Sequence, residues 1–299
     1  MLRNKLSVSA FLSLTPTWIV VLVIYLGTLV WSVNLSFTNS RFMPSDKYIG
    51  FYQYEKLFHT ARWLVSIENL IVFGVLYIGG CLCLGFILAA SLDRKVRFEN
   101  TFRTIFLYPY AMSFVVTGVV WQWILNPTLG VQSVVRSWGW ETFEFNWIVD
   151  PNMAIYTVVF AAVWQGAGLV MVILLASMKG INEDQWKAAR IEGIPVYRMY
   201  LSIILPQLTP AISAASMILG MAVIKTYDLV VALTSGGPGY ATEVPAKFIM
   251  DNLFERQNIG LAAAGATVLL VSVLAVIVPI KYAFYLKAKL SGSKGKVHA

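Results

Sequence analysis

Six stretches of the chain contain no Asp, Glu, Lys or Arg, and polar segments with charges separate them. They cover residues 11–33, 69–92, 104–125, 153–178, 203–224 and 260–280. Each has about 20 residues or more, which as an α-helix crosses a hydrocarbon layer of ~30 Å. None shows the polar–apolar alternation of a barrel strand, and lipid admits only helices or closed barrels. The pattern therefore predicts an all-α membrane protein with six transmembrane helices.

Composition supports this prediction. Hydrophobic residues make up 58% of the 299 residues and charged residues 13%, whereas soluble domains average about 45–50% and about 25%. The first stretch is longer than a signal-peptide core and lacks a small-residue cleavage site, so we expect a retained helix. We expect three parts: an N-terminal helix with an outer loop (1–66), a core of five helices (67–286) and a basic tail (287–299).

Charge in the loops predicts the orientation. Most of the 23 Lys and Arg residues lie in the N-terminus, in 93–103, in 179–202 and in the tail, which six spans place on one side. Because positive loops stay inside, both termini should be cytoplasmic. This topology accounts for the net charge of +8 without a nucleic-acid partner. The basic tail is expected near anionic membrane lipid.

Several kinds of chemistry are missing from the sequence. No expected span carries an ionisable residue, which argues against an ion-driven carrier, although backbone carbonyls could still bind sodium. We find no G-x-x-x-x-G-K-[ST] phosphate loop, no nucleophile–base set and no metal cluster; Cys81 and Cys83 are expected to be small packing residues. The protein is thus expected not to be an enzyme and to take energy from another protein. An ion-driven carrier or channel subunit and a non-transporting scaffold remain open alternatives.

One cytoplasmic segment is charged where its surroundings are apolar. Asn182 is a suitable N-cap, Gln185 would complete a capping box, and Gly193 followed by Pro195 ends the pattern. The predicted helix, 183–192, is ~15 Å long, too short to span a membrane. We expect it to lie across the membrane surface, with Trp186 and Ile191 as anchors, and to need a partner because short isolated helices are marginal.

The same segment reads "KAARIEG" and, after Gly193, "ILP" in register. It resembles the E-A-A-x-x-x-G-x(9)-I-x-L-P loop of the membrane subunits of bacterial binding-protein-dependent ABC importers. The resemblance implies the type I ABC importer permease fold and a coupling helix that sits on an ATP-binding subunit. Lys187 stands where the family has Glu, so the family's ion pair is not carried over. Glu183, Asp184 or Glu192 could take the place of that Glu, or the partner could differ. The expected coupling residues are Glu183, Asp184, Trp186, Lys187, Ala188, Ala189, Arg190, Ile191, Glu192 and Gly193.

A second segment, 227–266, contains "LTSGGPGYAT" and is similar to the corresponding region of carbohydrate ABC permeases. The resemblance extends over nearly the whole chain, and its overall look is closest to the glucose and α-glucoside type. The resemblance implies sugar import and an outer loop that meets an external binding protein at Gly236, Gly237, Pro238 and Gly239.

Sugars are bound by aromatic faces, amides and hydroxyls, which suggests candidates for the substrate pathway. Each has a plainer explanation: membrane-interface position for the tryptophans, a helix–helix hydrogen bond for Gln165, and packing for the serines. The candidates are Trp121, Gln122, Trp164, Gln165, Ser213, Ser216, Lys225, Tyr227 and Asp228.

The resemblance also implies an assembly in a bacterial inner membrane. It comprises a second, similar membrane subunit, two ATP-binding subunits and an external or periplasmic sugar-binding protein. No cofactor is expected in this chain, and ATP and Mg would bind the partner subunits. The sequence leaves the sugar open.

Overall fold

The computed structural model describes residues 13–93 and 97–275, which form helices joined by loops with isolated β-bridges. The chain divides into two compact units. Unit 1 comprises Met1–Ala61 and Phe248–Ala299, and unit 2 comprises Arg62–Lys247. The three-part division expected from the sequence stays a prediction. Its basic tail, 287–299, lies outside the described residues.

Unit 1 contains the first apolar helix, Ser13–Leu35, and the helix Ile259–Ala275. Between them lie α3 (Tyr52–Phe58), η4 (Asp251–Glu255) and part of α14 (Pro245–Met250). Gly260 N donates to Ser40 O at 2.9 Å and Gln53 Nε2 donates to Thr38 O at 3.1 Å. A Cβ at Gly260 would lie 2.6 Å from Thr38 O, so this close approach requires glycine.

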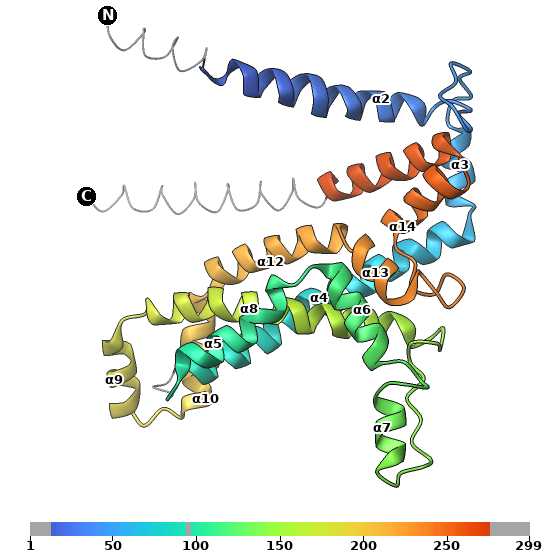
Figure 1. Ribbon diagram of the computed structural model, residues 1–299. Helices are drawn as coiled ribbons and strands as arrows, with labels where there is room; N and C mark the ends of the chain where they lie inside the picture. The colour runs from blue at the N-terminus through green and yellow to red at the C-terminus, as the bar shows by residue number, and fades with distance from the viewer. Residues whose placement is uncertain (1–12, 94–96, 276–299) are drawn as a thin grey trace, which may run out of the picture. The chain divides into compact units, whose positions relative to one another are not determined.

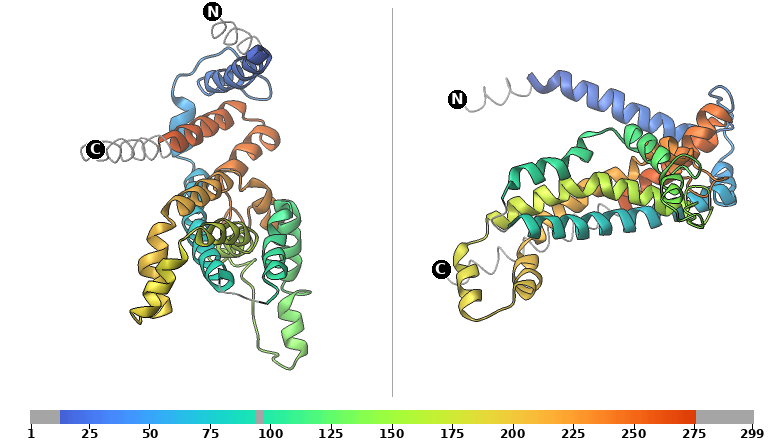
Figure 2. Two further views of the ribbon diagram at one scale, coloured as in Figure 1. Left: turned by 90° about the vertical axis from the view of Figure 1, so that its left-hand side faces the viewer. Right: turned by 60° about the horizontal axis from the view of Figure 1, so that its bottom comes forward.

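Unit 2 holds the middle of the chain (Figure 1). Long helices run alongside one another, and the short α9 crosses their direction at one end; the right-hand view of Figure 2 shows the same crossing. The elements are α4 (Ala61–Asp93), α5 (Glu99–Leu107), η2 (Tyr108–Ala111), α6 (Phe114–Ile124), α7 (Val131–Ser137), α8 (Ala154–Lys179), α9 (Glu183–Ile191), α10 (Val196–Arg198), η3 (Met199–Ile204), α11 (Leu205–Gln207), α12 (Thr209–Ile224) and α13 (Tyr227–Thr234).

The predicted all-α membrane architecture is confirmed. Three described helices are long and apolar enough to span a membrane: Ser13–Leu35, Ala61–Asp93 and Ala154–Lys179. The third and fifth predicted spans are bent pairs, by 99° between Glu99–Ala111 and Phe114–Ile124 and by 72° between Val196–Gln207 and Thr209–Ile224. The sixth is described as Ile259–Ala275, and the last residues of the predicted range, 276–280, lie outside the described part.

Proline accompanies both bends. Pro109 lies in η2, before the first bend, while Pro206 and Pro210 flank the second. Proline lacks the N–H that would continue the helical hydrogen bonds and its ring clashes with the preceding turn. The apolar pattern predicts which segments could span a membrane, and it does not predict where the helix in such a segment breaks.

α8 lies in the core of unit 2, and 67% of its most apolar stretch is buried, compared with 22% for α4. Small residues allow the close packing. A Cβ at Gly168 would lie 2.0 Å from Phe106 O, and one at Gly166 would lie 2.7 Å from Tyr77 Oη. Small residues bring backbones together in lipid, where van der Waals contact drives helix association. α8 therefore packs closely on both the α5–η2 segment and α4.

Candidate functional site

The start of α9 follows the sequence prediction in one respect and differs in another. Asn182 Oδ1 accepts from Asp184 N at 2.9 Å, as an N-cap residue does. Gln185 does not use its side chain for the expected capping box; its Oε1 accepts a hydrogen bond from Gln207 Nε2 at 2.8 Å. The amide of Gln185 therefore connects α9 to α11, the short helix that precedes α12.

The end of α9 is a Schellman motif. Gly193 has φ +67°, its N donates to Arg190 O at 3.2 Å, and Ile194 N donates to Ala189 O at 2.9 Å. This pair of bonds satisfies the last carbonyls of a helix and places a left-handed residue at the turn, which glycine adopts without strain. The backbone conformation at residue 193 thus explains the glycine, since a Cβ there would meet open space.

One face of α9 is held by the rest of unit 2. Ala189 is buried, and the half-buried Trp186 packs edge-on against Tyr200 with ring centroids 5.3 Å apart. Tyr200 Oη in turn donates to Asp93 Oδ2 at 3.0 Å and to Ala90 O at 3.3 Å. Trp186 therefore holds α9 against the rest of unit 2, and Tyr200 and Asp93 are partners that the sequence did not single out.

The opposite face of α9 is open. Ile191 is 87% exposed, so its role as an anchor for α9 stays a prediction. Glu183, Ala188 and Arg190 are exposed as well. Lys187 Nζ lies 3.1 Å from Asp184 Oδ1, and both side chains are more than half exposed. A pair of this kind contributes little to stability, so Lys187 and Asp184 remain accessible to a partner.

The predicted outer loop, between α13 and α14, is a compact turn. Ser235, Gly236 and Gly239 have φ values of +53°, +85° and +62°. Thr242 is fully buried; its hydroxyl donates to Gly237 O at 2.9 Å and lies 2.7 Å from that of Thr234. The glycines predicted for binding-protein contact therefore belong to a loop with a defined shape.

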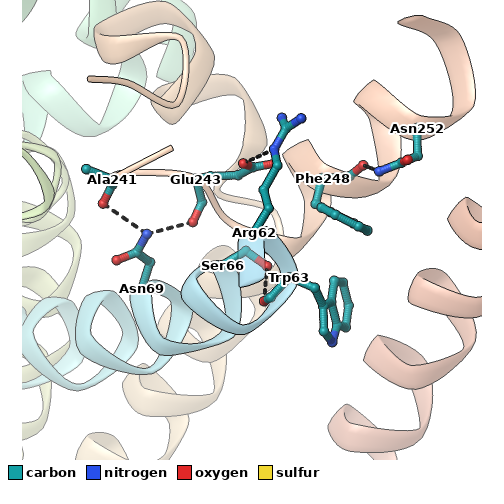
Figure 3. A network of polar contacts seen from close by, with 8 residues as sticks. All are labelled: Arg62, Trp63, Ser66, Asn69, Ala241, Glu243, Phe248 and Asn252. Carbon is teal, nitrogen blue, oxygen red and sulfur yellow. Dashed lines mark hydrogen bonds and ion pairs between the residues drawn. The ribbon is translucent and has the colours of Figure 1, made fainter. Parts of the chain in front are cut away.

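The loop is fastened to the start of α4 (Figure 3). The Arg62 guanidinium forms an ion pair with the Glu243 carboxylate, whose side chain is 1% exposed. Asn69 Nδ2 donates to Ala241 O at 3.0 Å and to Glu243 O at 2.9 Å. Sequence reasoning missed these residues, because Arg62 and Glu243 look like ordinary loop charges and Asn69 opens an uncharged stretch.

The predicted pathway tryptophans meet between α6 and α8. Trp121 packs edge-on against Trp164, with ring centroids 5.5 Å apart, and against Phe160 at 4.9 Å. Gln165 is buried, and its Nε2 donates to Met112 O at 2.6 Å, at the bend between η2 and α6. Gln165 thereby satisfies a carbonyl that the broken helix leaves free.

The remaining candidates lie at three places. Gln122 lines a cavity of about 310 Å³ together with Asn126, Thr234, Ser235, Gly237 and Pro238, so a predicted pathway residue meets the outer loop. On α12, Ser213 Oγ donates to Pro210 O at 2.8 Å, and Ser216 is half-buried. Lys225 and Asp228 are exposed, with Tyr227 half-buried between them, where α12 ends and α13 begins.

The sequence of more than half of the chain matches a known family. Residues 82–284 match the family described as "Binding-protein-dependent transport system inner membrane component". The chain belongs to this family. It is a multi-pass membrane component of a transport system and not an enzyme.

Curated relatives agree with this assignment. The chain is 37% identical over 276 residues to a "Probable ABC transporter permease protein" of Pyrococcus horikoshii, covering 92% of this chain and 94% of the relative. It is 31% identical over 288 residues to a xylose/arabinose import permease protein of Haloferax volcanii, covering 93% and 89%.

A solved structure supports the fold. The crystal structure of a bacterial ABC transporter that imports the acidic polysaccharide alginate contains a chain with a TM-score of 0.78 to this one. The match covers 96% of each chain at 19% identity. At that identity the likeness shows the ABC importer permease fold and says nothing of the substrate.

Proposed function

We propose that this protein is the membrane subunit of an ATP-driven sugar importer and forms half of the translocation pathway. The observation that carries the proposal is α9, a short helix with one face fixed on unit 2 and the other exposed. Its position at the end of the long helices suits transmission of movement from an ATP-binding subunit to the spans. The ATP and Mg bind those partner subunits.

The exposed residues of α9 supply the docking face. Ile191 gives an apolar contact, Ala188 permits close approach, and Glu183 and Arg190 offer charges of both signs. Exposed apolar side chains next to charges are typical of protein interfaces. Lys187 replaces the family's Glu, so we infer that a carboxylate on the ATP-binding subunit meets Lys187 or that Glu183 contacts a basic residue there.

The outer loop and the cavity beside it form the entry side. We infer that an external binding protein contacts Gly236–Gly239 and that Gln122 receives a sugar hydroxyl as the substrate leaves that protein. Amides that line a cavity with apolar walls suit carbohydrate binding. A second, similar membrane subunit completes the pathway, and the termini of this chain face the cytoplasm of a bacterial cell.

Relatives favour sugar among the possible substrates. Beside the xylose/arabinose permease, they include a multiple sugar-binding transport system permease of Streptococcus mutans, 25% identical over 237 residues, with 79% of this chain and 81% of the relative covered. Within that class we propose the glucose or α-glucoside branch, on the overall resemblance of the chain to permeases of that type.

Co-purification followed by reconstitution tests the proposal. The tagged chain is expressed with its neighbouring transport genes, purified, and placed in proteoliposomes with a panel of sugar-loaded binding proteins. We expect a co-eluting ATP-binding subunit and second permease, and uptake that requires ATP. Transport by this chain alone that follows an ion gradient would establish the carrier alternative, and a co-eluting partner without transport would establish a scaffold.

A further inference from the structure

We propose that α4 is a connector that joins the outer loop to the coupling helix within one subunit. Arg62 and Asn69 hold the loop at the outer end of α4, and Asp93 holds Tyr200, which packs on α9, at the other. Through this connector, contact at the outer loop changes the position of α9. The inference rests on the proposed function and assigns positioning residues to it.

At the outer end, the loop and α4 move as one piece. Glu243 is buried against Arg62, and the Asn69 amide holds two successive regions of loop backbone, Ala241 O and Glu243 O (Figure 3). Separating the loop from α4 would break a mostly buried ion pair and two hydrogen bonds, which is costly. A binding protein that displaces the loop therefore displaces α4.

At the cytoplasmic end, the connection runs through Tyr200. Its hydroxyl donates to Asp93 Oδ2 and Ala90 O, in the last turn of α4. Its ring lies against Trp186 of α9 at 5.3 Å and against Phe86 of α4 at 6.4 Å, both edge-on. Tyr200 is 7% exposed. One buried side chain thus contacts the coupling helix and the end of α4 together.

Between these ends α4 is a single helix of 33 residues, which is ~50 Å long. The spans built from Glu99–Ile124 and Val196–Ile224 bend by 99° and 72°, and a bend absorbs movement that an unbroken helix transmits. Glycines also hold α4 close to α8: a Cβ at Gly80 would lie 2.9 Å from Val163, and one at Gly85 would lie 2.7 Å from Val170.

The test measures ATP hydrolysis by the reconstituted complex with and without the sugar-loaded binding protein. Glu243→Gln removes the carboxylate charge at the outer end, and Tyr200→Phe removes one hydroxyl while keeping the ring that packs on Trp186. We expect each variant to lose about fivefold or more of the stimulation by the binding protein, with hydrolysis in its absence unchanged. The double variant should lose no more than the worse single variant, because both changes interrupt one connection.

Matched controls lie nearby. Glu144→Gln removes the exposed ion pair with Arg136 of α7, and Tyr197→Phe alters an exposed tyrosine close to Tyr200. Neither should change the stimulation. Hydrolysis without binding protein and recovery of the intact complex report folding, and Tyr200→Phe carries the test if Glu243→Gln does not assemble.

The outcomes separate the two ideas. Two results would overturn the connector and leave the importer assignment intact. One is that the binding protein stimulates ATP hydrolysis as in the wild type in both Tyr200→Phe and an assembled Glu243→Gln variant. The other is that the losses of stimulation in the two single variants add in the double variant. A wild-type complex whose hydrolysis ignores the binding protein would instead count against the proposed function itself.

Discussion

The two ends of unit 2 are built differently. At the proposed coupling end, the Asp184–Lys187 pair is exposed, and α9 is held by the packing of Trp186 and by the hydrogen bond between Gln185 and Gln207. At the outer end, Glu243 and Arg62 form an ion pair that is mostly buried. The exposed pair leaves its charges accessible to the partner proposed for α9. A loop that keeps its shape without a partner must satisfy its charges within the chain.

The largest expected effect comes from the turn that ends α9. Gly193→Pro cannot adopt the left-handed φ of residue 193 and loses the N–H that bonds to Arg190 O. Backbone strain of this kind costs about 1–3 kcal/mol, so α9 should lose its defined orientation. We expect ATP-driven uptake in proteoliposomes to fall about tenfold or more while ATP hydrolysis continues.

Gly139→Pro is the matched control, because Gly139 also has a left-handed φ, +101°, but lies in the loop after α7. Its uptake should stay closer to wild type. Equal losses in the two variants would mean that a general folding defect, and not the coupling turn, explains the result.

The next effect compares charges at the two ends. Glu243→Gln removes the carboxylate that pairs with Arg62. Removing one member of a buried ion pair costs about 3–5 kcal/mol. Because Arg62 is partly exposed, we expect the loss of stability to be at or below the lower end of that range. Asp184→Asn should change stability by about 0.5 kcal/mol or less. Thermal unfolding in detergent should therefore shift for the first variant and hardly for the second; similar shifts would contradict the comparison.

A smaller effect is expected at Asn69. Asn69→Ala leaves the carbonyls of Ala241 and Glu243 without this donor, at a cost of about 1–3 kcal/mol. Hydrogen exchange in the loop 235–243 should quicken, while exchange in α9 should stay unchanged in the absence of partners. An unchanged loop would show that Arg62 and Glu243 hold it without the amide.

The smallest effect is expected at Lys187. Lys187→Glu restores the family's acidic residue and places it next to Asp184, at an exposed site. The melting temperature of the isolated chain should move little, since exposed pairs contribute about 0–1 kcal/mol. A large drop would mean that the coupling end depends on its own charges, as the outer end does.

The sequence by itself determined the membrane class, the approximate number of spans, and α9 with its ends. These features follow from local patterns: uncharged runs long enough for the bilayer, an N-cap at Asn182, and a glycine at residue 193, where the chain turns after the helix ends. Helix ends and apolar runs depend on neighbouring residues, so they can be read without the fold. The family resemblance rested on the same continuous segments.

Tertiary structure alone decided which polar side chains meet. Arg62 and Glu243 are 181 residues apart in sequence, and Tyr200 and Asp93 are 107 apart. Nothing local marks either pair, because an ion pair or a hydrogen bond depends on positions that only packing creates. Packing likewise brings the Gln165 amide to the carbonyl of Met112 and places Gln122 at a cavity that it shares with the predicted outer loop. In the sequence both residues are glutamines next to tryptophans, and nothing local distinguishes them.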